Sequence, residues 1–231
     1  MIAKQPKLKA VLFDMDGTVI DTEAVYTLAW QAAFEKLGME FPTELFSRCI
    51  GLSLVMSRAC VNEHYNDPEF FDKVFPIAAS WVYNYQKLNG VPVKAGFAEL
   101  IDYLDENGIK AVIATSTSHA AAVQNLKDAK IFHRFVGLIG GDDVENGKPG
   151  PEPFLRAAQL ANADVSECLA VEDSANGVRS AVAAGVRCIH VCDVVDIGNE
   201  LKSTLFRSVT TLDEIIGIIE ELNGSNQSHC L

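Results

Sequence analysis

The sequence predicts an α/β fold in which a parallel sheet has helices on both faces and a small all-helical domain is inserted after the first strand. Two observations predict this fold. Short apolar runs alternate with segments of helical periodicity over most of the chain, which favours a parallel sheet with right-handed crossovers. One long region, residues 22–92, has helical signals and no segment typical of a strand. We therefore expect one domain formed by residues 1–21 and 93–231, and a second formed by residues 22–92.

The first predicted strand, Ala10–Phe13, ends in two carboxylates. The run is wholly apolar, as expected of a strand buried on both faces in the middle of a parallel sheet. Alternation along an extended chain places Asp14 and Asp16 on the same side, and Gly17 permits the tight turn that follows. Such carboxylates repel each other, so they require a cation, a shared proton or both, and magnesium is the natural candidate. An acidic turn without a function is the alternative, because Asp and Gly are ordinary turn residues.

The inserted region reads as several helices. Apolar residues recur at helical spacing after Asp21 and stop at Gly38, which we expect to end the first helix. From there to about Gly90 the signals stay helical. Because proline disfavours helical backbone before it, we expect breaks at Phe41-Pro42, Asp67-Pro68 and Phe75-Pro76.

Strands and helices alternate beyond Pro92. The expected strands are Lys110–Ala114, Phe135–Ile139, Cys168–Val171, Arg187–Val191 and Ser208–Thr210. The expected helices are marked by Phe97–Leu104, Ala122–Ala129, Pro151–Asn162, Ser174–Gly185 and Asp213–Leu222. The tail, residues 223–231, is expected to be disordered.

Composition excludes several classes of partner. The chain has 231 residues, of which 48% are hydrophobic, and this fits a soluble globular protein with a sizeable core. A net charge of −12 without any basic run argues against nucleic-acid and anionic-membrane partners. No run of about 18 apolar residues predicts a membrane span, and the N-terminal residues lack the apolar stretch of a signal peptide. Six scattered cysteines without zinc-site spacing favour a reducing compartment, and we expect the cytoplasm.

Hydroxyl groups follow the second strand. Thr115 and Ser116 end an apolar run just before a helix, where a hydroxyl and free backbone N–H groups could hold an anion. The alternative for Thr115 is simple capping of the helix. We read the next two residues, Thr117 and Ser118, as N-caps of that helix.

Charged residues follow the third and fourth strands. Lys148 lies in a Gly-Lys-Pro sequence that stiffens the backbone around it, although a solvated loop lysine is the alternative. Glu172 and Asp173 directly follow an apolar strand, where carboxylates are costly unless they are paired or bind a metal. Either could instead be an N-cap, but Ser174 is available for that role. The carboxyl ends of parallel strands meet at one edge of a sheet, so these residues should lie together with Asp14.

These residues match the four motifs of the haloacid dehalogenase superfamily: Asp14-Met-Asp16-Gly-Thr, Thr115, Lys148 and Glu172-Asp173. The resemblance covers nearly the whole chain. Residues 22–92 resemble the helical, C1-type cap of that superfamily, and the Gly-Lys-Pro and Val-Glu-Asp-Ser strings resemble the beta-phosphoglucomutase-like phosphatases. The resemblance implies a Rossmann-like core and a magnesium-dependent phosphatase that acts on a small phosphorylated metabolite such as a sugar phosphate.

The resemblance also implies a role for each residue. Asp14 would attack phosphorus to form an aspartyl-phosphate, and Asp16 would act as general acid and then general base. The groups implied to hold the phosphoryl oxygens are Thr115, Ser116, Lys148 and adjacent backbone amides. The implied ligands of magnesium are Asp14, the carbonyl of Asp16, and Asp173, with Glu172 either binding the ion or lying just behind its ligands.

Three other functions fit the motif residues less well. Asp16 argues against dehalogenation, because departure of a halide needs no general acid. A sugar-phosphate mutase is the nearer alternative, but Tyr26 stands where the mutases have a histidine, and the segment Gly51-Leu52-Ser53-Leu54 has a leucine where they have an arginine. A non-catalytic protein that binds a phosphometabolite is the alternative from another class, and it should have a broken motif, whereas none is broken.

The sequence leaves the substrate open. Arg48, Arg58 and Lys87 are the nearest positive groups of the cap and are candidates for substrate contact, although each could be solvated surface. A monomer is the default expectation for a capped enzyme of this size.

Overall fold

The computed structural model describes residues 7–49, 54–192 and 197–224, and it separates them into two compact units. One unit contains the described residues of 1–20 and 93–231, and the other contains those of 21–92. Gly51–Ser53 of the predicted cap loop and residues 225–231 of the predicted tail lie outside the described residues.

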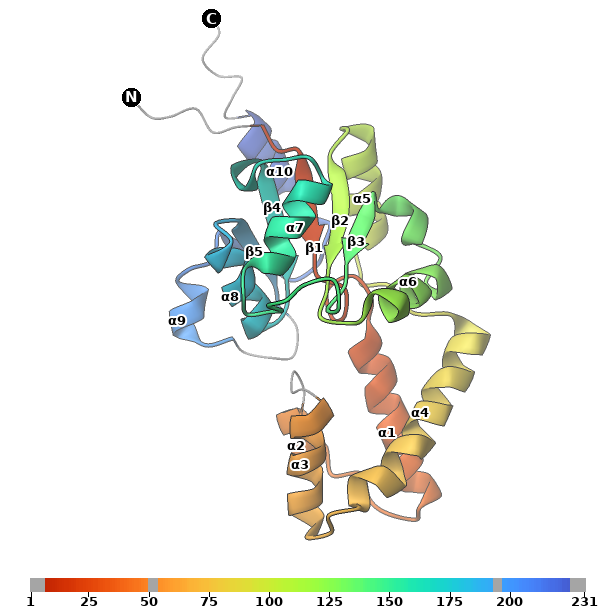
Figure 1. Cartoon of the computed structure of the whole chain (residues 1–231). Coiled ribbons are helices and arrows are strands. Elements are labelled where there is room, and N and C mark those ends of the chain that lie inside the picture. The colour runs from red at the N-terminus through yellow and green to blue at the C-terminus, as the bar shows by residue number, and fades with distance from the viewer. Residues whose placement is uncertain (1–6, 50–53, 193–196, 225–231) are drawn as a thin grey trace, which may run out of the picture. The chain divides into compact units, whose positions relative to one another are not determined.

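The larger unit is built on a six-stranded sheet in which all strand pairs are parallel. The strand order is β3-β2-β1-β4-β5-β6 (Figure 1). The strands are β1 (Ala10–Phe13), β2 (Lys110–Ala114), β3 (Gly137–Ile139), β4 (Cys168–Glu172), β5 (Arg187–Val191) and β6 (Arg207–Val209). In the centre, Phe13 lies opposite Ile113 of β2 and Val171 of β4. The residues that follow these three strands therefore meet at one edge of the sheet.

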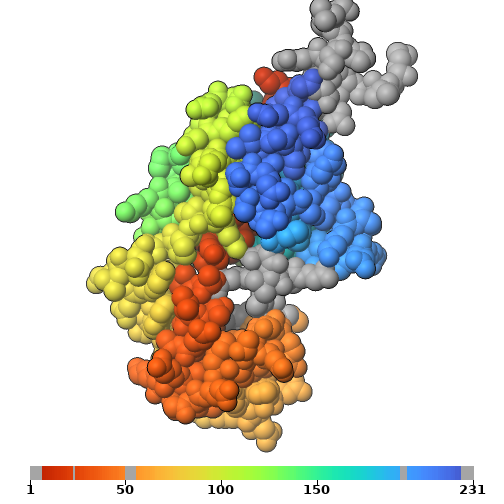
Figure 2. All heavy atoms as spheres, turned by 180° about the vertical axis from the view of Figure 1, so that it is seen from behind, coloured from red at the N-terminus to blue at the C-terminus, as the bar shows by residue number. Residues whose placement is uncertain are grey.

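Helices cover both faces of the sheet, so the predicted α/β fold is confirmed. On one face, Leu12, Val112 and Ala170 pack against α7 (Glu152–Leu160) and α8 (Ala175–Ala183). On the other face, the ring of Phe13 meets that of Phe97 from α5, at 6.5 Å between centroids. Helix α10 packs beside α5, as Figure 2 shows from behind. The remaining elements of this unit are α5 (Phe97–Glu106), α6 (His119–Asp128), α9 (Asn199–Lys202), α10 (Glu214–Gly224) and the 3₁₀ turns η1 (Phe132–Arg134) and η2 (Val165–Glu167).

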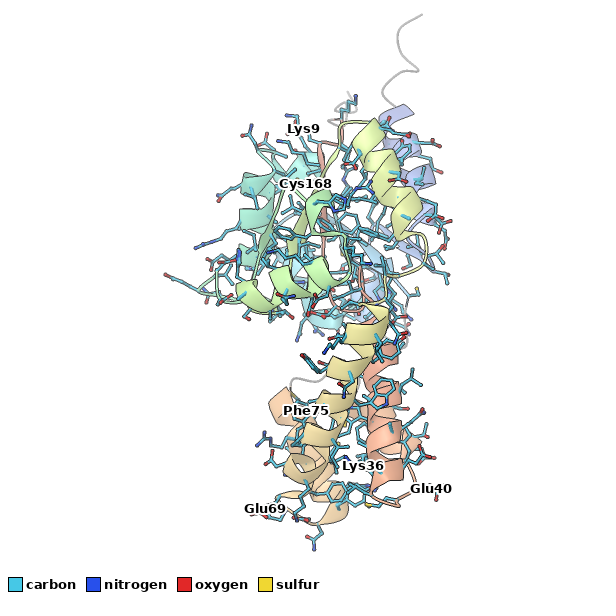
Figure 3. The ribbon with its side chains drawn as sticks, turned by 90° about the vertical axis from the view of Figure 1, so that its right-hand side faces the viewer. Lys9, Lys36, Glu40, Glu69, Phe75 and Cys168 are labelled. Atoms are coloured by element: carbon cyan, nitrogen blue, oxygen red, sulfur yellow. The ribbon has the colours of Figure 1, made fainter. Side chains whose placement is uncertain are left out.

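The smaller unit is all-helical within the described residues. It comprises α1 (Thr22–Lys36), α2 (Thr43–Cys49), α3 (Leu54–Tyr65) and α4 (Phe70–Asn89). Apolar residues of α1 and α4, including Phe34 and Val74, form its core. Phe75, labelled in Figure 3, stacks on Phe71 at 5.2 Å and lies 6.1 Å from the ring of Trp30. Among the described helices of both units, none has the length and apolar character that a membrane span requires.

Three expectations about element boundaries are wrong. Helix α4 continues through Pro76, because Val74, Ala78 and Val82 on its buried face pack in the core with α1, and this packing outweighs the hydrogen bond that proline removes. The third strand begins at Gly137, two residues later than expected, and the ring of Phe135 packs against the ring of Phe13 instead. The last helix extends to Gly224, into the segment expected to be disordered.

A glycine lets the first turn of α8 lie against the end of β4. Ser174 is the N-cap of α8, and its Oγ accepts the backbone N–H of Gly177 at 3.0 Å. A Cβ atom at Gly177 would overlap the carboxylate of Glu172, which is fully buried. Only glycine leaves room for that carboxylate.

We predict opposite effects for two substitutions of glycine by alanine in helices. Gly177→Ala should lower the free energy of unfolding by about 1–3 kcal/mol, because the added methyl group must displace Glu172 or the helix. Gly217→Ala in α10, where a Cβ meets no atom within 4 Å, should raise it by up to about 1 kcal/mol. Denaturant unfolding followed by circular dichroism in excess chelator measures both. Equal stabilities for the two variants would contradict the packing of Glu172 under α8.

Candidate active site

Three buried polar residues lie at the carboxyl ends of the central strands. Asp14 follows β1, Thr115 follows β2, and Glu172 ends β4, with exposed fractions of 8%, 3% and 0%. Their backbones are fixed by the sheet: the N–H of Asp14 donates to the carbonyl of Val171 at 2.9 Å, and the N–H of Thr115 donates to that of Ile139 at 3.0 Å. The sheet register therefore sets where the polar groups stand.

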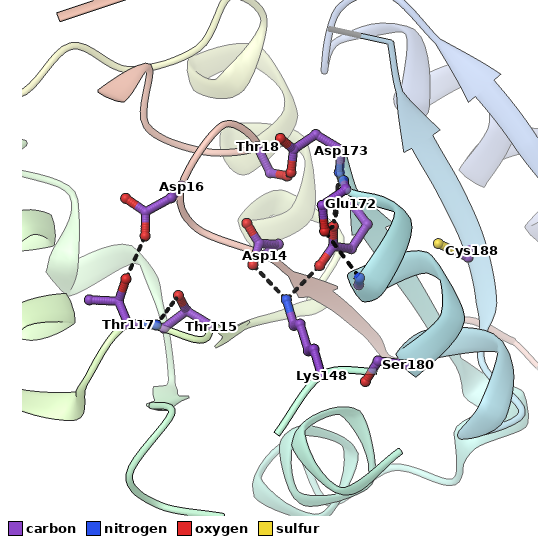
Figure 4. A network of polar contacts seen from close by, with 12 residues as sticks. Asp14, Asp16, Thr18, Thr115, Thr117, Lys148, Glu172, Asp173, Ser180 and Cys188 are labelled. Carbon is purple, nitrogen blue, oxygen red and sulfur yellow. Dashed lines mark hydrogen bonds and ion pairs between the residues drawn. The ribbon is translucent and has the colours of Figure 1, made fainter. Parts of the chain in front are cut away.

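Lys148 joins two of these groups. Its Nζ lies 2.5 Å from Oδ1 of Asp14 and 2.5 Å from Oε1 of Glu172, and its side chain is only 4% exposed (Figure 4). The ring of Phe154 lies under the ammonium, at 5.1 Å from the centroid. The loop is held further along the chain, where Oγ of Ser180 donates to the carbonyl of Gly150 at 2.5 Å. Lys148 is therefore a buried partner of two carboxylates and not a solvated loop lysine.

Burial and neighbouring charges shift the pKa values of both Asp14 and Lys148. Burial raises the pKa of Asp14 well above its ordinary value, and the neighbouring carboxylates add to this rise while Lys148 opposes it. Burial alone would lower the pKa of Lys148, but Asp14 and Glu172 outweigh burial and raise it. The site thus carries more negative charge than one lysine neutralises, and it favours the arrival of a cation.

Glu172 has both carboxylate oxygens engaged. Oε1 accepts from Lys148, whereas Oε2 accepts the N–H groups of Asp173 and Ser174 at 3.0 and 2.9 Å and the Oγ–H of Ser174 at 3.0 Å. Charge-assisted hydrogen bonds of this kind hold a carboxylate in one orientation. Glu172 therefore orients Lys148 and the start of α8 at the same time.

The donor set fits a divalent metal ion. Asp14, Glu172 and Asp173 each offer a carboxylate oxygen, and these oxygens lie within 4.8 Å of one another. Hard oxygen donors of this kind suit Mg²⁺. Asp173 is fixed by the turn after β1, because its Oδ1 accepts Thr18 Oγ1 at 2.9 Å and a Cβ at Gly17, whose φ is +84°, would overlap its carboxylate.

Asp16 lies apart from this cluster. Figure 4 shows its carboxylate turned toward Thr117, whose Oγ1 donates to Oδ2 of Asp16 at 2.7 Å. Of the two residues read as N-caps, Ser118 occupies that position of α6, whereas Thr117 contacts the acid and donates its N–H to Oγ1 of Thr115 at 3.1 Å. Ser116, between the two threonines, is exposed.

Three polar residues near the site were not predicted from the sequence. Thr18 and Thr117 donate to Asp173 and Asp16 as described, and the Nε2 atom of the buried His190 lies 3.1 Å from the carbonyl oxygen of Asp173. Thr18 belongs to the Asp-x-Asp-Gly-Thr string, so its signal was present. For His190 the signal is weaker: one polar residue in the otherwise apolar second half of the strand Arg187–Val191.

The three cationic candidates of the cap differ in their surroundings. Arg58 pairs with Asp72 at 3.0 Å, and its guanidinium lies 5.5 Å from the centroid of the Phe71 ring. Arg48 and Lys87 are exposed in the last turns of α2 and α4. Contact of any of them with a substrate stays a prediction.

Comparison with known proteins places the chain in a family. The model of the haloacid dehalogenase-like hydrolases matches residues 8–185. The chain is 29% identical to the phosphorylated carbohydrates phosphatase of Thermotoga maritima, over 93% of this chain and 100% of that protein. It is 30% identical to the plasmid-encoded protein CbbY of Cupriavidus necator, over 78% of this chain and 76% of that one. The crystal structure of a proposed beta-phosphoglucomutase from Thermotoga maritima superposes with a TM-score of 0.78 and 26% identity, covering 93% and 99% of the two chains.

These matches agree with the sequence motifs and with the fold. The family model spans most of the larger unit and all of the helical insertion that follows β1. The expectations of a hydrolytic enzyme and of a parallel sheet with a helical insertion are therefore confirmed. The chain belongs to the haloacid dehalogenase-like hydrolase family, in the beta-phosphoglucomutase-like group that carries a helical cap.

Proposed function

We propose that the protein is a magnesium-dependent phosphatase that hydrolyses a small phosphorylated metabolite, such as a sugar phosphate, through an aspartyl-phosphate on Asp14. The observation that carries this proposal is the buried Lys148, which contacts Asp14 and Glu172 beside a carboxylate cluster suited to a divalent ion. The relative that acts on phosphorylated carbohydrates supports the substrate class.

Asp14 is the nucleophile in this mechanism. One of its oxygens attacks phosphorus while the bond from phosphorus to the leaving oxygen breaks. Lys148 holds Oδ1 of Asp14 in place, and the hydroxyl of Thr115, with neighbouring N–H groups, is placed to donate to phosphoryl oxygens. When bound, Mg²⁺ would be held by Asp14, the Asp16 carbonyl and Asp173, with Glu172 behind, and would neutralise charge between them and the phosphoryl group.

Asp16 moves the protons. In the first step it protonates the leaving oxygen, so that an alcohol and not an alkoxide departs. The resulting carboxylate then removes a proton from the water that attacks the aspartyl-phosphate, and this step releases phosphate and restores Asp14. The separate position of Asp16, away from the Asp14–Lys148–Glu172 group, supports a separate role (Figure 4).

A sugar-phosphate mutase is the second candidate, because a proposed beta-phosphoglucomutase is among the structural relatives. Tyr26, at the position of the mutase histidine, is 44% exposed on α1, and Gly51–Ser53 lie outside the described residues. Conversion of a sugar 1-phosphate to the 6-phosphate, stimulated by a bisphosphate, would distinguish a mutase from a phosphatase. A binding protein would show neither reaction.

We predict that hydrolysis requires a divalent cation and Asp14. A screen of phosphorylated sugars, sugar acids, polyols and nucleotides with Mg²⁺ should yield at least one substrate, and excess chelator should abolish its turnover. Asp14→Asn should lower kcat by several orders of magnitude and leave the circular dichroism spectrum unchanged. A variant that kept a tenth of the rate would show that Asp14 is not the nucleophile.

A second prediction concerns the leaving group. Asp16→Asn should slow hydrolysis of a sugar phosphate by about 10²–10⁴-fold, but should slow the first step on an aryl phosphate much less, because a phenolate leaves without protonation. The second step still lacks its base, so p-nitrophenyl phosphate should give a burst equal to the enzyme concentration. Rapid-quench kinetics measures the burst. Equal losses on both substrates without a burst would contradict the acid-base role.

A third prediction tests the buried lysine. Lys148→Met should lower the free energy of unfolding in excess chelator by about 3–5 kcal/mol, because Asp14 and Glu172 would face each other without a cation. Mg²⁺ should stabilise this variant more than the wild type. The control is Lys9→Met: the pair of Lys9 and Glu167 is at the surface, with Lys9 57% exposed, and its loss should change the free energy of unfolding far less than the loss of Lys148. Similar losses in both variants would contradict the buried ion-pair network.

A further inference from the structure

We propose that Thr117 is a positioning residue for Asp16: its hydroxyl binds Oδ2 of Asp16 and orients the carboxyl group toward the leaving oxygen. This inference rests on the proposed function, because it concerns the acid-base step assigned to Asp16. The geometry that carries it is the 2.7 Å hydrogen bond from Oγ1 of Thr117 to Oδ2 of Asp16, between residues 101 positions apart.

The donor is held in place from several sides. The backbone N–H of Thr117 donates to Oγ1 of Thr115 at 3.1 Å, and its carbonyl accepts the N–H of Gly141 at 2.8 Å. A Cβ at Gly141 would overlap the carbonyl of Ser116, so this close approach requires glycine. The loop after β2 is therefore pinned to the loop after β3, and the hydroxyl of Thr117 projects from a fixed backbone.

The acceptor has a fixed backbone and a short side chain. The N–H of Gly17 donates to the carbonyl of Ile20 at 2.9 Å, and Asp16 forms a bridge with Ile20, so the turn after β1 is closed. The carboxylate of Asp16 is only half-buried, and its staggered rotamers would aim it in different directions. A hydrogen bond from a pinned donor selects one of them.

A hydroxyl suits both steps of the reaction. When the proton is on Oδ1, Thr117 donates to Oδ2, and the proton can pass to the leaving oxygen as its bond to phosphorus breaks. When Asp16 is a carboxylate, the same hydrogen bond persists, and Oδ1 can accept the proton of the attacking water. Thr117 transfers no proton itself and acts only through the orientation of Asp16.

The test compares leaving groups in Thr117 variants of the full-length enzyme with Mg²⁺. Thr117→Val, which keeps the branched shape without the hydroxyl, should lower kcat/KM about tenfold to a hundredfold for the best sugar phosphate of the screen. For p-nitrophenyl phosphate the burst rate should fall by less than about threefold, since its first step needs little acid catalysis. Thr117→Ser, which restores the hydroxyl, should recover sugar-phosphate turnover to within about threefold of wild type.

A matched control and a double-mutant cycle exclude a merely structural role. Ser118→Ala changes the adjacent hydroxyl residue, an exposed N-cap whose side chain makes no capping hydrogen bond, and it should leave both activities unchanged. Adding Thr117→Val to Asp16→Asn should cause no further loss on the sugar phosphate, because the residue would have nothing left to orient.

Two failures are distinguishable. The inference would be overturned if Thr117→Val slowed both substrates equally. It would also be overturned if Thr117→Val lowered kcat/KM for the sugar phosphate as much in the Asp16→Asn background as in the wild type. In both cases wild-type hydrolysis would still support the proposed function. Absence of metal-dependent hydrolysis in the wild type would overturn the proposed function, and the role of Thr117 with it.

Discussion

The contact of Lys148 with Asp14 and Glu172 is the interaction on which the rest of the site depends. Two carboxylates buried at the end of a sheet cannot both stay ionised without a neighbouring cation, because burial disfavours each charge and each disfavours the other. Lys148 supplies that charge with its side chain 4% exposed, and the two carboxylates in turn raise the pKa of Lys148 against the effect of burial. Removal of Lys148 would leave two buried carboxylates without a cation, whereas removal of either carboxylate would leave Lys148 paired with the other.

The topology of the sheet brings this group together from distant parts of the chain. The central strand β1 lies between β2 and β4, although more than 90 residues separate Phe13 from Lys110 and the whole helical unit is inserted between them. Because all neighbouring strands are parallel, their carboxyl ends lie at the same edge of the sheet. A residue that directly follows a strand therefore lies at the site. Lys148 is the exception, since it comes from a loop, and that loop is tied to α8 through Ser180.

The same reasoning explains how much of the molecule the sequence could predict. Strands buried on both faces leave continuous apolar runs, so β1 and β4 were recognisable, and the polar residues at their ends, Asp14 and Glu172, were recognisable with them. The hydrogen bond from Thr117 to Asp16 was not predictable, because sequence patterns do not encode loop conformation. Loop conformation decides which of the four adjacent hydroxyl residues caps α6 and which turns toward the acid. The expected helix break at Pro76 was wrong for a related reason. Packing of α4 against α1 outweighs the low helix propensity of proline.

Asp14 and Asp16, the two carboxylates of one short turn, therefore differ in exposure and in the groups that contact them. Asp14 is 8% exposed and lies beside the ammonium of Lys148, a fixed cation that suits the nucleophilic role we propose for this carboxylate. Asp16, two residues later, is more exposed and meets a neutral hydroxyl, which can accompany the carboxyl group in either protonation state. Lys148 beside Asp14 and the hydroxyl of Thr117 beside Asp16 thus suit the two different roles, nucleophile and proton carrier, that we propose for the carboxylates of this turn.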